Sequence, residues 1–474
     1  MYAPFMNATD PLLYRLGHGL LRLALGFYFS RIERFHQERV PATGPVLFTS
    51  NHPNSVTDAF VIGASVPRKV SFVATVQLFR FAPLRWLLTR CGVIPINRAK
   101  DDPRAMRTVL DTFEACFRVL ERGEAIGIFP EGITHDDPQL KTVKTGAARM
   151  ALELEHRHAG KLGLRLVPVG LTFSAKERYR SDVLVNFGQP IAVADWLAGY
   201  PENRHEAIRR LTAEIERRID SLILHLDRLE RARLVQAVKR LYLDHLRVAN
   251  RVVHEPVSPR AGELLLTQAI ARAVDYTYEH HPDRAAAFAR KLDHFEHWLK
   301  RLNLSDEELA HFSGRMQLLW QSLTWTFLGL VLLPVAVYGW LHRLLPILVI
   351  RWAIKRFAQL DTDRTHVSTT AILAGVVSFG VSYGVYLAIF HALFGWPASL
   401  WYALSLPVAS LVAHYYLRGL RRFAVSARCA WVRLRTPISA RHLLALRNEL
   451  IAEIDAARWQ VPAEALTRDP RPFP

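Results

Sequence analysis

Cysteine is scarce in this sequence of 474 residues, which contains only three. Cys91, Cys116 and Cys429 are scattered, and no two of them have the C-x-x-C spacing of a metal or redox pair. The scarcity argues against a cysteine-based metal framework and predicts a reducing compartment. The stretch 135–137, which reads His-Asp-Asp, is interpreted as a solvated loop. The sequence therefore predicts no bound metal and no cofactor.

Acidic residues are absent between Asp363 and Glu449, in a chain whose formal net charge is +18 and whose pI is about 10.1. Arginines are retained in or beside that stretch: Arg364, Arg418, Arg421, Arg422, Arg428, Arg433 and Arg435. A basic excess is typical of proteins that bind nucleic acid or an anionic membrane. These cations flank apolar segments, which favours lipid headgroups. The sequence also has no helix-turn-helix, zinc-finger or aromatic-basic RNA motif. We therefore expect membrane lipids, and no nucleic acid, as partners.

The first 39 residues lack the charged n-region of a cleavable signal peptide, and Arg15 and Arg22 interrupt their apolar stretch. Apolar residues recur there at helical spacing: Leu12, Leu13, Leu16, Leu20, Leu23, Leu25 and Phe27. The pattern predicts an amphipathic helix within 1–39 that lies in the membrane interface. A helix packed into a protein core is the alternative.

Long apolar runs lie in the last third of the chain. Residues 323–341, 370–394 and 399–417 contain no charged side chain and have about the length of a bilayer span. We therefore expect a membrane-embedded region over 318–420. A buried helical core is the alternative.

The basic flanks of these runs suggest a topology. If positive flanks stay inside, 370–394 and 399–417 form a transmembrane hairpin. The segment 323–357, which contains two prolines, is then re-entrant rather than a crossing. Three full crossings are the alternative. The same reasoning places the basic tail 421–474 in the cytoplasm. We expect the protein in the cell inner membrane, with the domain 40–198 on the cytoplasmic side.

Residues 40–198 alternate short β-rich runs with helical stretches. Strands are expected in PVLFTSN (45–51), KVSFVATV (69–76), GVIPIN (92–97), AIGIFPEG (125–132), LRLVPVGLTF (164–173) and DVLVNFGQPI (182–191). Helical spacing between them predicts an α/β fold with a mainly parallel sheet flanked by helices. Residues 199–317 form a charged helical region that carries no recognisable chemistry, and coiled-coil pairing is an alternative for it.

The stretch LFTSNHPNSVTDAFVIG places His52 and Asp58 after a predicted buried strand. Histidine can accept a proton from a hydroxyl, and a nearby carboxylate can fix its tautomer and stabilise the imidazolium. The pair resembles two members of a Ser-His-Asp triad without the protein nucleophile. A substrate hydroxyl could then be the nucleophile, which indicates acyl transfer. Helix capping and packing is the alternative for this pair taken alone.

Other strand ends carry candidate binding residues. Arg98 ends GVIPINR and offers a fork suited to a phosphate. Glu131 and Gly132 in IFPEG combine a hydrogen-bond acceptor with a residue that permits close backbone approach. Lys141 and Lys144 precede a predicted helix start, where anions bind. Each alone also fits a strand end, a turn or a solvated lysine.

Taken in order, these stretches resemble the glycerolipid acyltransferases of the 1-acylglycerol-3-phosphate and glycerol-3-phosphate O-acyltransferase family. The matching blocks are Asn51-His52…Asp58, Gly92…Arg98, Phe129-Pro130-Glu131-Gly132 and Val167-Pro168-Val169. The resemblance covers residues 40–195. It implies transfer of a fatty acyl group from acyl-CoA or acyl carrier protein to a hydroxyl of a glycerol-phosphate or lysophospholipid acceptor in phospholipid synthesis.

The resemblance also implies roles for individual residues. His52 would be the general base and Asp58 its orienter. Arg98, with Lys144 as a second candidate, would bind the acceptor phosphate. Glu131 and Gly132 would position the glycerol, and Asn51 belongs to the same substrate-binding set. The acceptor is left open between glycerol 3-phosphate, dihydroxyacetone phosphate and lysophospholipids, and a catalytically silent membrane scaffold is the alternative to an enzyme.

The sequence departs from the family pattern in two places. Five residues, rather than the usual four, separate His52 from Asp58, a form that looks like the branch containing fungal-type glycerol-3-phosphate and dihydroxyacetone-phosphate acyltransferases. One added residue would rotate Asp58 by about 100° on a regular helix, so we expect the turn before the helix to absorb it. Thr134-His135 follows the Glu-Gly pair where Thr-Arg-Ser is common, which puts part of the phosphate contact in doubt.

Overall fold

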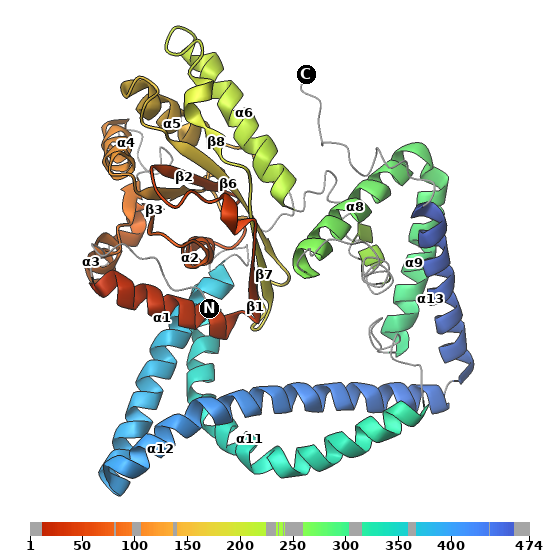
Figure 1. The fold of residues 1–474 in the computed structure, drawn as a ribbon. Helices are drawn as coiled ribbons and strands as arrows, with labels where there is room; N and C mark the ends of the chain where they lie inside the picture. The colour runs from red at the N-terminus through yellow and green to blue at the C-terminus, as the bar shows by residue number, and fades with distance from the viewer. Residues whose placement is uncertain are drawn as a thin grey trace.

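The computed structural model divides into an α/β domain, a separate helical unit and two long apolar helices (Figure 1). It describes residues 12–79, 82–96, 106–135, 140–223, 234–235, 237–239, 241, 259–302, 315–358, 366–435 and 437–458.

An eight-stranded sheet forms the centre of the α/β domain. Its strands are β1 (Arg31–Phe35), β2 (Val46–Ser50), β3 (Val70–Thr75), β4 (Ile94–Ile96), β5 (Ala125–Ile128), β6 (Arg165–Phe173), β7 (Asp182–Phe187) and β8 (Ile191–Ala192). The order is β1-β7-β6-β2-β5-β3-β4, and β8 pairs with β6. Only the β6/β7 and β6/β8 pairs are antiparallel. The predicted mainly parallel sheet with flanking helices is confirmed, and every predicted strand is present.

Helices cover both faces of this sheet. They are α1 (Leu12–Tyr28), α2 (Val56–Ser65), α3 (Ala82–Arg90), α4 (Met106–Glu121), α5 (Gly146–Arg157) and α6 (Arg204–Leu222), with short 3-10 turns η1 (Gln37–Arg39), η2 (Val76–Phe79) and η3 (Val193–Trp196). Alternate residues of β2 enter different cores. Leu47 packs with α4, α5 and α6, whereas Val46 and Phe48 pack with α1 and α2. Burial on both faces explains why β2 is apolar without alternation.

Two domain boundaries differ from those expected. The amphipathic helix ends at Tyr28 rather than extending toward residue 39, because Arg31–Phe35 joins the sheet as an edge strand parallel to β7. Helix α6, which was assigned to the separate helical region after residue 198, packs Leu211 and Ile215 into the core of the α/β domain. The outer face of α1 still exposes Leu16, Leu20 and other leucines, as an interfacial helix would.

The helical unit joins chain segments that are distant in sequence. Helices α8 (Pro259–His280) and α9 (Pro282–Leu302) pack with α13 (Pro437–Arg458) around one apolar core (Figure 1). Lys291 on α9 also pairs with Glu449 and Glu453 on α13. This part of the segment 421–474, which was expected to be a basic tail, is therefore an integral helix of the unit.

Within the part of the chain that the structure describes, two helices are long and apolar enough to cross a membrane. They are Gly329–Phe357 within α11 (Arg315–Phe357) and Val367–Leu420 within α12 (Val367–Arg435). The backbone of α12 breaks at Gly395, between the two runs expected to form a hairpin. Helix α11 is continuous through Pro334 and Pro346. The chain reversal that a re-entrant segment requires therefore does not occur within 323–357. The orientation of these helices in a membrane stays a prediction.

Candidate active site

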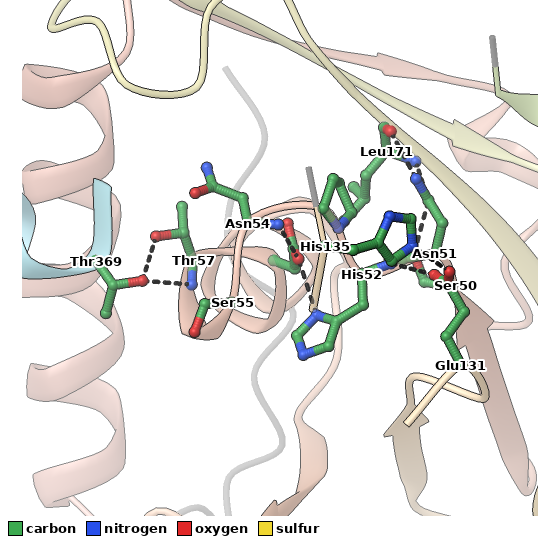
Figure 2. Close-up of polar contacts among 12 residues, drawn as sticks. Ser50, Asn51, His52, Asn54, Ser55, Thr57, Glu131, His135, Leu171 and Thr369 are labelled. Atoms are coloured by element: carbon green, nitrogen blue, oxygen red, sulfur yellow. Dashed lines mark hydrogen bonds and ion pairs between the residues drawn. The ribbon is translucent and has the colours of Figure 1, made fainter. Parts of the chain in front are cut away.

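The candidate site lies where parallel strands end. His52 follows β2, and Glu131 follows its neighbour β5. Because neighbouring parallel strands have their carboxyl ends at the same edge, residues 79 apart in sequence meet there. Figure 2 shows His52, Glu131, His135 and Asn51 gathered at this edge.

His52 and Asp58 form a hydrogen-bonded pair. Nδ1 of His52 lies 2.9 Å from Oδ2 of Asp58, and the carboxylate also accepts the backbone N–H of Asn54 at 2.7 Å. The imidazole stacks on Phe129, with ring centroids 4.0 Å apart and planes inclined by 10°. An ionised carboxylate only accepts hydrogen bonds, so Nδ1 carries the proton and Nε2 keeps a lone pair. The pair therefore has the geometry of a base with its orienter.

The carboxyl group of Asp58 is fully buried. Burial raises the pKa of Asp58 above its ordinary value of 3.8, because it disfavours the charged form. The hydrogen bond from His52, the Asn54 N–H and the charge of Lys176 act in the opposite direction. These three partners offset part of the cost of burying the carboxylate anion.

The additional residue between His52 and Asp58 is absorbed before the helix, as expected. Helix α2 begins at Val56, and its N-cap residue Ser55 has a φ of 52° and a ψ of −138°. A positive φ is uncommon for a residue with a Cβ and indicates local strain. Asp58 thereby lies in the first turn, where the carboxylate reaches back to the imidazole.

Glu131 is buried, and its described bonds go to the protein. Oε1 accepts the backbone N–H of His52 at 2.8 Å, and Oε2 accepts the backbone N–H of Lys141 at 2.8 Å. Oε2 also accepts a short hydrogen bond from Nε2 of His135. The carboxylate is only 1% exposed. It ties together the two loops that follow β2 and β5, and its predicted contact with the glycerol stays a prediction.

Gly132 and Lys144 lie against each other beside this carboxylate. Gly132 has a φ of +68°, and a Cβ placed on it would come within 2.5 Å of Nζ of Lys144. The backbone N–H of Lys144 donates to the carbonyl of Pro130 at 2.9 Å. Lys144 itself is exposed. The predicted contact of Lys144 with the acceptor phosphate stays a prediction.

Asn51 continues the hydrogen bonding of β2 beyond the end of the strand. Its Oδ1 accepts the N–H of Leu171 at 2.8 Å, and its Nδ2 donates to the carbonyl of Leu171 at 3.0 Å. The side-chain amide thus makes the two hydrogen bonds to β6 that the backbone of a further β2 residue would make. These bonds orient the loop that begins with His52. A direct contact of Asn51 with substrate stays a prediction. Arg98, the expected phosphate ligand, lies outside the described residues.

The structure adds residues that the sequence motifs did not indicate. Lys176, after β6, donates from Nζ to the carbonyl of Pro53 at 2.7 Å. His135, which was noted for replacing the arginine of the family pattern and was expected to begin a solvated loop, is instead buried and bonded to Glu131. His366, Ser368 and Thr369 reach the site from the start of α12. No local signal links those three residues to the motif, because their contacts depend on tertiary structure.

Comparison with known proteins identifies the class of this domain. Residues 31–172 match the model of the family described as Acyltransferase. This part of the chain is an acyltransferase-family domain, related to glycerol-3-phosphate and 1-acylglycerol-3-phosphate O-acyltransferases.

Among its relatives, glycerol-3-phosphate O-acyltransferase 1 of Saccharomyces cerevisiae is 32% identical over 324 residues, covering 50% of this chain and 43% of the relative. The chloroplastic 1-acyl-sn-glycerol-3-phosphate acyltransferase LPAT1 of Arabidopsis thaliana is 27% identical over 177 residues, or 36% of this chain and 46% of the relative. The chain thus spans less than half the length of either protein.

A crystal structure of the 1-acyl-sn-glycerophosphate acyltransferase PlsC from Thermotoga maritima aligns with a TM-score of 0.34 and 17% identity. The alignment covers 44% of this chain and 79% of that one.

Proposed function

We propose that this protein is a membrane-bound O-acyltransferase. It transfers a fatty acyl group from acyl-CoA or acyl carrier protein to a hydroxyl of a glycerol-phosphate or lysophospholipid acceptor. The observation that carries the proposal is the His52–Asp58 pair, with Nδ1 and Oδ2 2.9 Å apart at the sheet edge of an acyltransferase-family domain.

The pair supports a balanced acyl transfer. Nε2 of His52 takes the proton of the acceptor hydroxyl as the oxygen attacks the thioester carbonyl carbon. The tetrahedral intermediate then collapses, the C–S bond breaks, and the thiolate leaves with the proton carried by His52. Asp58 stabilises the imidazolium between these steps. An ester replaces the thioester, and no redox change occurs.

The acceptor phosphate is assigned to two cations, Lys144 and Arg98. Lys144 is an exposed residue whose ammonium group lies beside Gly132. Arg98 follows β4 in the sequence, two residues after the strand ends at Ile96. Both would bind a phosphate monoester. Glycerol 3-phosphate, dihydroxyacetone phosphate and lysophosphatidate provide one, whereas lysophospholipids with an esterified headgroup carry a phosphodiester.

Membrane attachment fits a reaction whose acyl chains partition into the bilayer. The exposed leucines of α1 and the apolar lengths of α11 and α12 would hold the domain at the bilayer surface. We place the protein in the cell inner membrane with the α/β domain in the cytoplasm, where acyl thioesters are supplied. A silent scaffold would have no need for a hydrogen-bonded base with a lone pair left on Nε2.

An acceptor panel tests the function. The full chain in lipid nanodiscs is supplied with radiolabelled acyl-CoA and, in separate reactions, glycerol 3-phosphate, dihydroxyacetone phosphate, lysophosphatidate or lysophosphatidylcholine. We expect labelled ester with at least one phosphate-monoester acceptor. Repeating the panel with acyl carrier protein thioesters covers the second donor. Absence of labelled product with every donor and acceptor would contradict the proposal.

A further inference from the structure

A short segment of the apolar region contacts the loop of the catalytic pair. Residues 366–369, which we term the docking turn, begin α12 and lie more than 300 positions after the loop 53–57, which we term the catalytic turn. Figure 2 shows Thr369 facing Thr57 from the neighbouring helix. The two segments are in direct hydrogen-bonding contact at three successive points.

Each point of contact joins one residue of the catalytic turn to one of the docking turn. Nδ2 of Asn54 donates to Oγ of Ser368 at 3.3 Å. Oγ of Ser55 lies 2.9 Å from Nδ1 of His366. The backbone N–H of Thr57 donates to Oγ1 of Thr369 at 3.2 Å, and the two threonine hydroxyls are 2.9 Å apart.

These bonds replace a helix cap that α2 does not supply itself. The first backbone N–H groups of a helix have no partner within it, and a serine at the N-cap ordinarily accepts one of them. Ser55 occupies the N-cap of α2 but makes no such bond, because its hydroxyl pairs with His366. Thr57 is fully buried, so its N–H has no access to water. Thr369 accepts that N–H and caps α2 from a distant part of the chain.

The docking turn is itself fixed to the α/β domain. Ser368 is fully buried, accepts a hydrogen bond from the hydroxyl of Tyr28 on α1, and donates to the carbonyl of Lys176. Nζ of Lys176 returns to the carbonyl of Pro53 in the catalytic turn. One turn further along α12, Ile372 is buried in the core beneath α1 and α2. The contact between the docking turn and the α/β domain therefore combines hydrogen bonds with apolar packing.

The contact between the docking turn and the catalytic turn also affects the position of the Asp58 carboxylate. Asp58 follows Thr57 in the first turn of α2, and its Oδ2 is also held by the N–H of Asn54. Asn54, which donates to this carboxylate, and Thr57, which precedes Asp58, are each bonded to the docking turn. A displacement of the first turn of α2 would therefore move Oδ2 away from Nδ1 of His52.

We propose that Thr369, Ser368 and His366 are positioning residues for acyl transfer, and that the apolar helix α12 sets the geometry of the His52–Asp58 pair as well as providing attachment. This inference rests on the proposed function. The longer His-x5-Asp spacing gives the reason for the arrangement. The additional residue leaves Ser55 in a strained conformation without its usual capping bond. In the docking turn, Thr369 accepts the N–H of Thr57, and His366 pairs with the hydroxyl of Ser55.

The test uses full-length protein in lipid nanodiscs. Thr369→Val keeps the branched shape and removes the accepting oxygen, Thr369→Ser restores the oxygen, and Thr370→Val makes the same change one residue further along, where the described structure gives no bond to the catalytic turn. A misplaced catalytic group lowers turnover by one to two orders of magnitude. We expect about a tenfold or larger loss of kcat in Thr369→Val with the acceptor KM within about twofold of wild type. Thr369→Ser should recover most of the loss, and Thr370→Val should match wild type.

Backbone amide exchange provides a readout that does not depend on turnover. In Thr369→Val, peptides covering residues 53–62 should exchange faster than in wild type, while those covering β6 and α5 should not change. Unchanged exchange at 53–62, or a Thr369→Val kcat within twofold of an active wild type, would overturn the inference. An inactive wild type would instead contradict the proposed function, and the exchange result would still decide whether Thr369 holds the catalytic turn.

Discussion

Glu131 fixes the backbone of His52: its Oε1 accepts the N–H of His52 at 2.8 Å, at the edge where the paired strands β2 and β5 end. The same carboxylate accepts hydrogen bonds from the backbone N–H of Lys141 and from Nε2 of His135. One buried group thus receives three donors from three segments. This arrangement makes the residue a structural centre of the site, whatever contact it makes with substrate.

Replacing Glu131 with glutamine tests that role. An amide has one oxygen and turns an NH2 group toward one of the donors, which leaves a buried N–H unsatisfied. We expect a loss of about 1–3 kcal/mol in unfolding free energy, together with reduced acyl transfer. Unfolding of detergent-solubilised protein by denaturant measures the first effect. The exposed Glu202, in the turn before α6, changed to glutamine, is the matched control and should leave stability unchanged. Equal stability of both variants would contradict the central role of Glu131.

His52→Ala removes the proposed base. General-base assistance contributes on the order of 10²–10⁴ in rate, so acyl transfer should fall by that factor. Expression and membrane attachment should persist, because neither depends on the imidazole. Transfer of labelled acyl groups is measured on membranes normalised for protein content. Undiminished activity would refute the assignment of His52.

The pH dependence of stability tests the environment of Asp58. Since burial raises the pKa of this carboxyl in the folded state, the folded protein holds the proton more tightly than the unfolded chain. The protonated carboxyl of Asp58 therefore contributes fully to the unfolding free energy below the ordinary pKa of 3.8. This contribution is lost as pH rises through the higher pKa of the folded state. Asp58→Asn cannot ionise and lacks this dependence.

We therefore expect the unfolding free energy of Asp58→Asn to rise relative to wild type between pH 3.8 and neutrality, while the variant loses acyl transfer. Denaturant unfolding of both proteins at several pH values measures the difference. A difference that does not change with pH, or one that changes in favour of wild type, would show that burial is not the dominant influence on Asp58.

The sequence predicts the sheet and the proximity of His52 and Asp58, for a physical reason. Strands buried on both faces are apolar throughout, and His52 and Asp58 are only six positions apart, so local geometry brings them together. The cap of α2 is different. Thr57 and Thr369 are 312 positions apart, and nothing in the composition of either segment indicates the other. Edge strand β1 was also missed, because the charged sequence RIERF is only half-buried in the sheet and lacks an apolar signal.

Phosphate binding can be tested by removing the proposed cations one at a time. Lys144→Ala and Arg98→Ala should each raise the KM for glycerol 3-phosphate or lysophosphatidate with little change in kcat, because a phosphate contact remote from the reacting hydroxyl stabilises ground state and transition state alike. Lys161→Ala, an exposed lysine after α5, is the control. A fall in kcat alone would rule out the phosphate role for the residue concerned.

The contact between the two apolar helices rests on a glycine. A Cβ on Gly339 of α11 would overlap the backbone carbonyl of Ala409 on α12, whereas a Cβ on Gly380 of α12 would meet nothing within 4 Å. Small residues at such contacts let helix backbones approach closely in membranes. We therefore expect Gly339→Ala to separate α11 from α12 and to lower the temperature at which the detergent-solubilised protein aggregates. Gly380→Ala should leave that temperature unchanged or raise it slightly, since alanine favours helix. Size-exclusion chromatography after graded heating compares the two variants, and equal loss of the monodisperse peak in both would show that the close approach at Gly339 does not stabilise the pair.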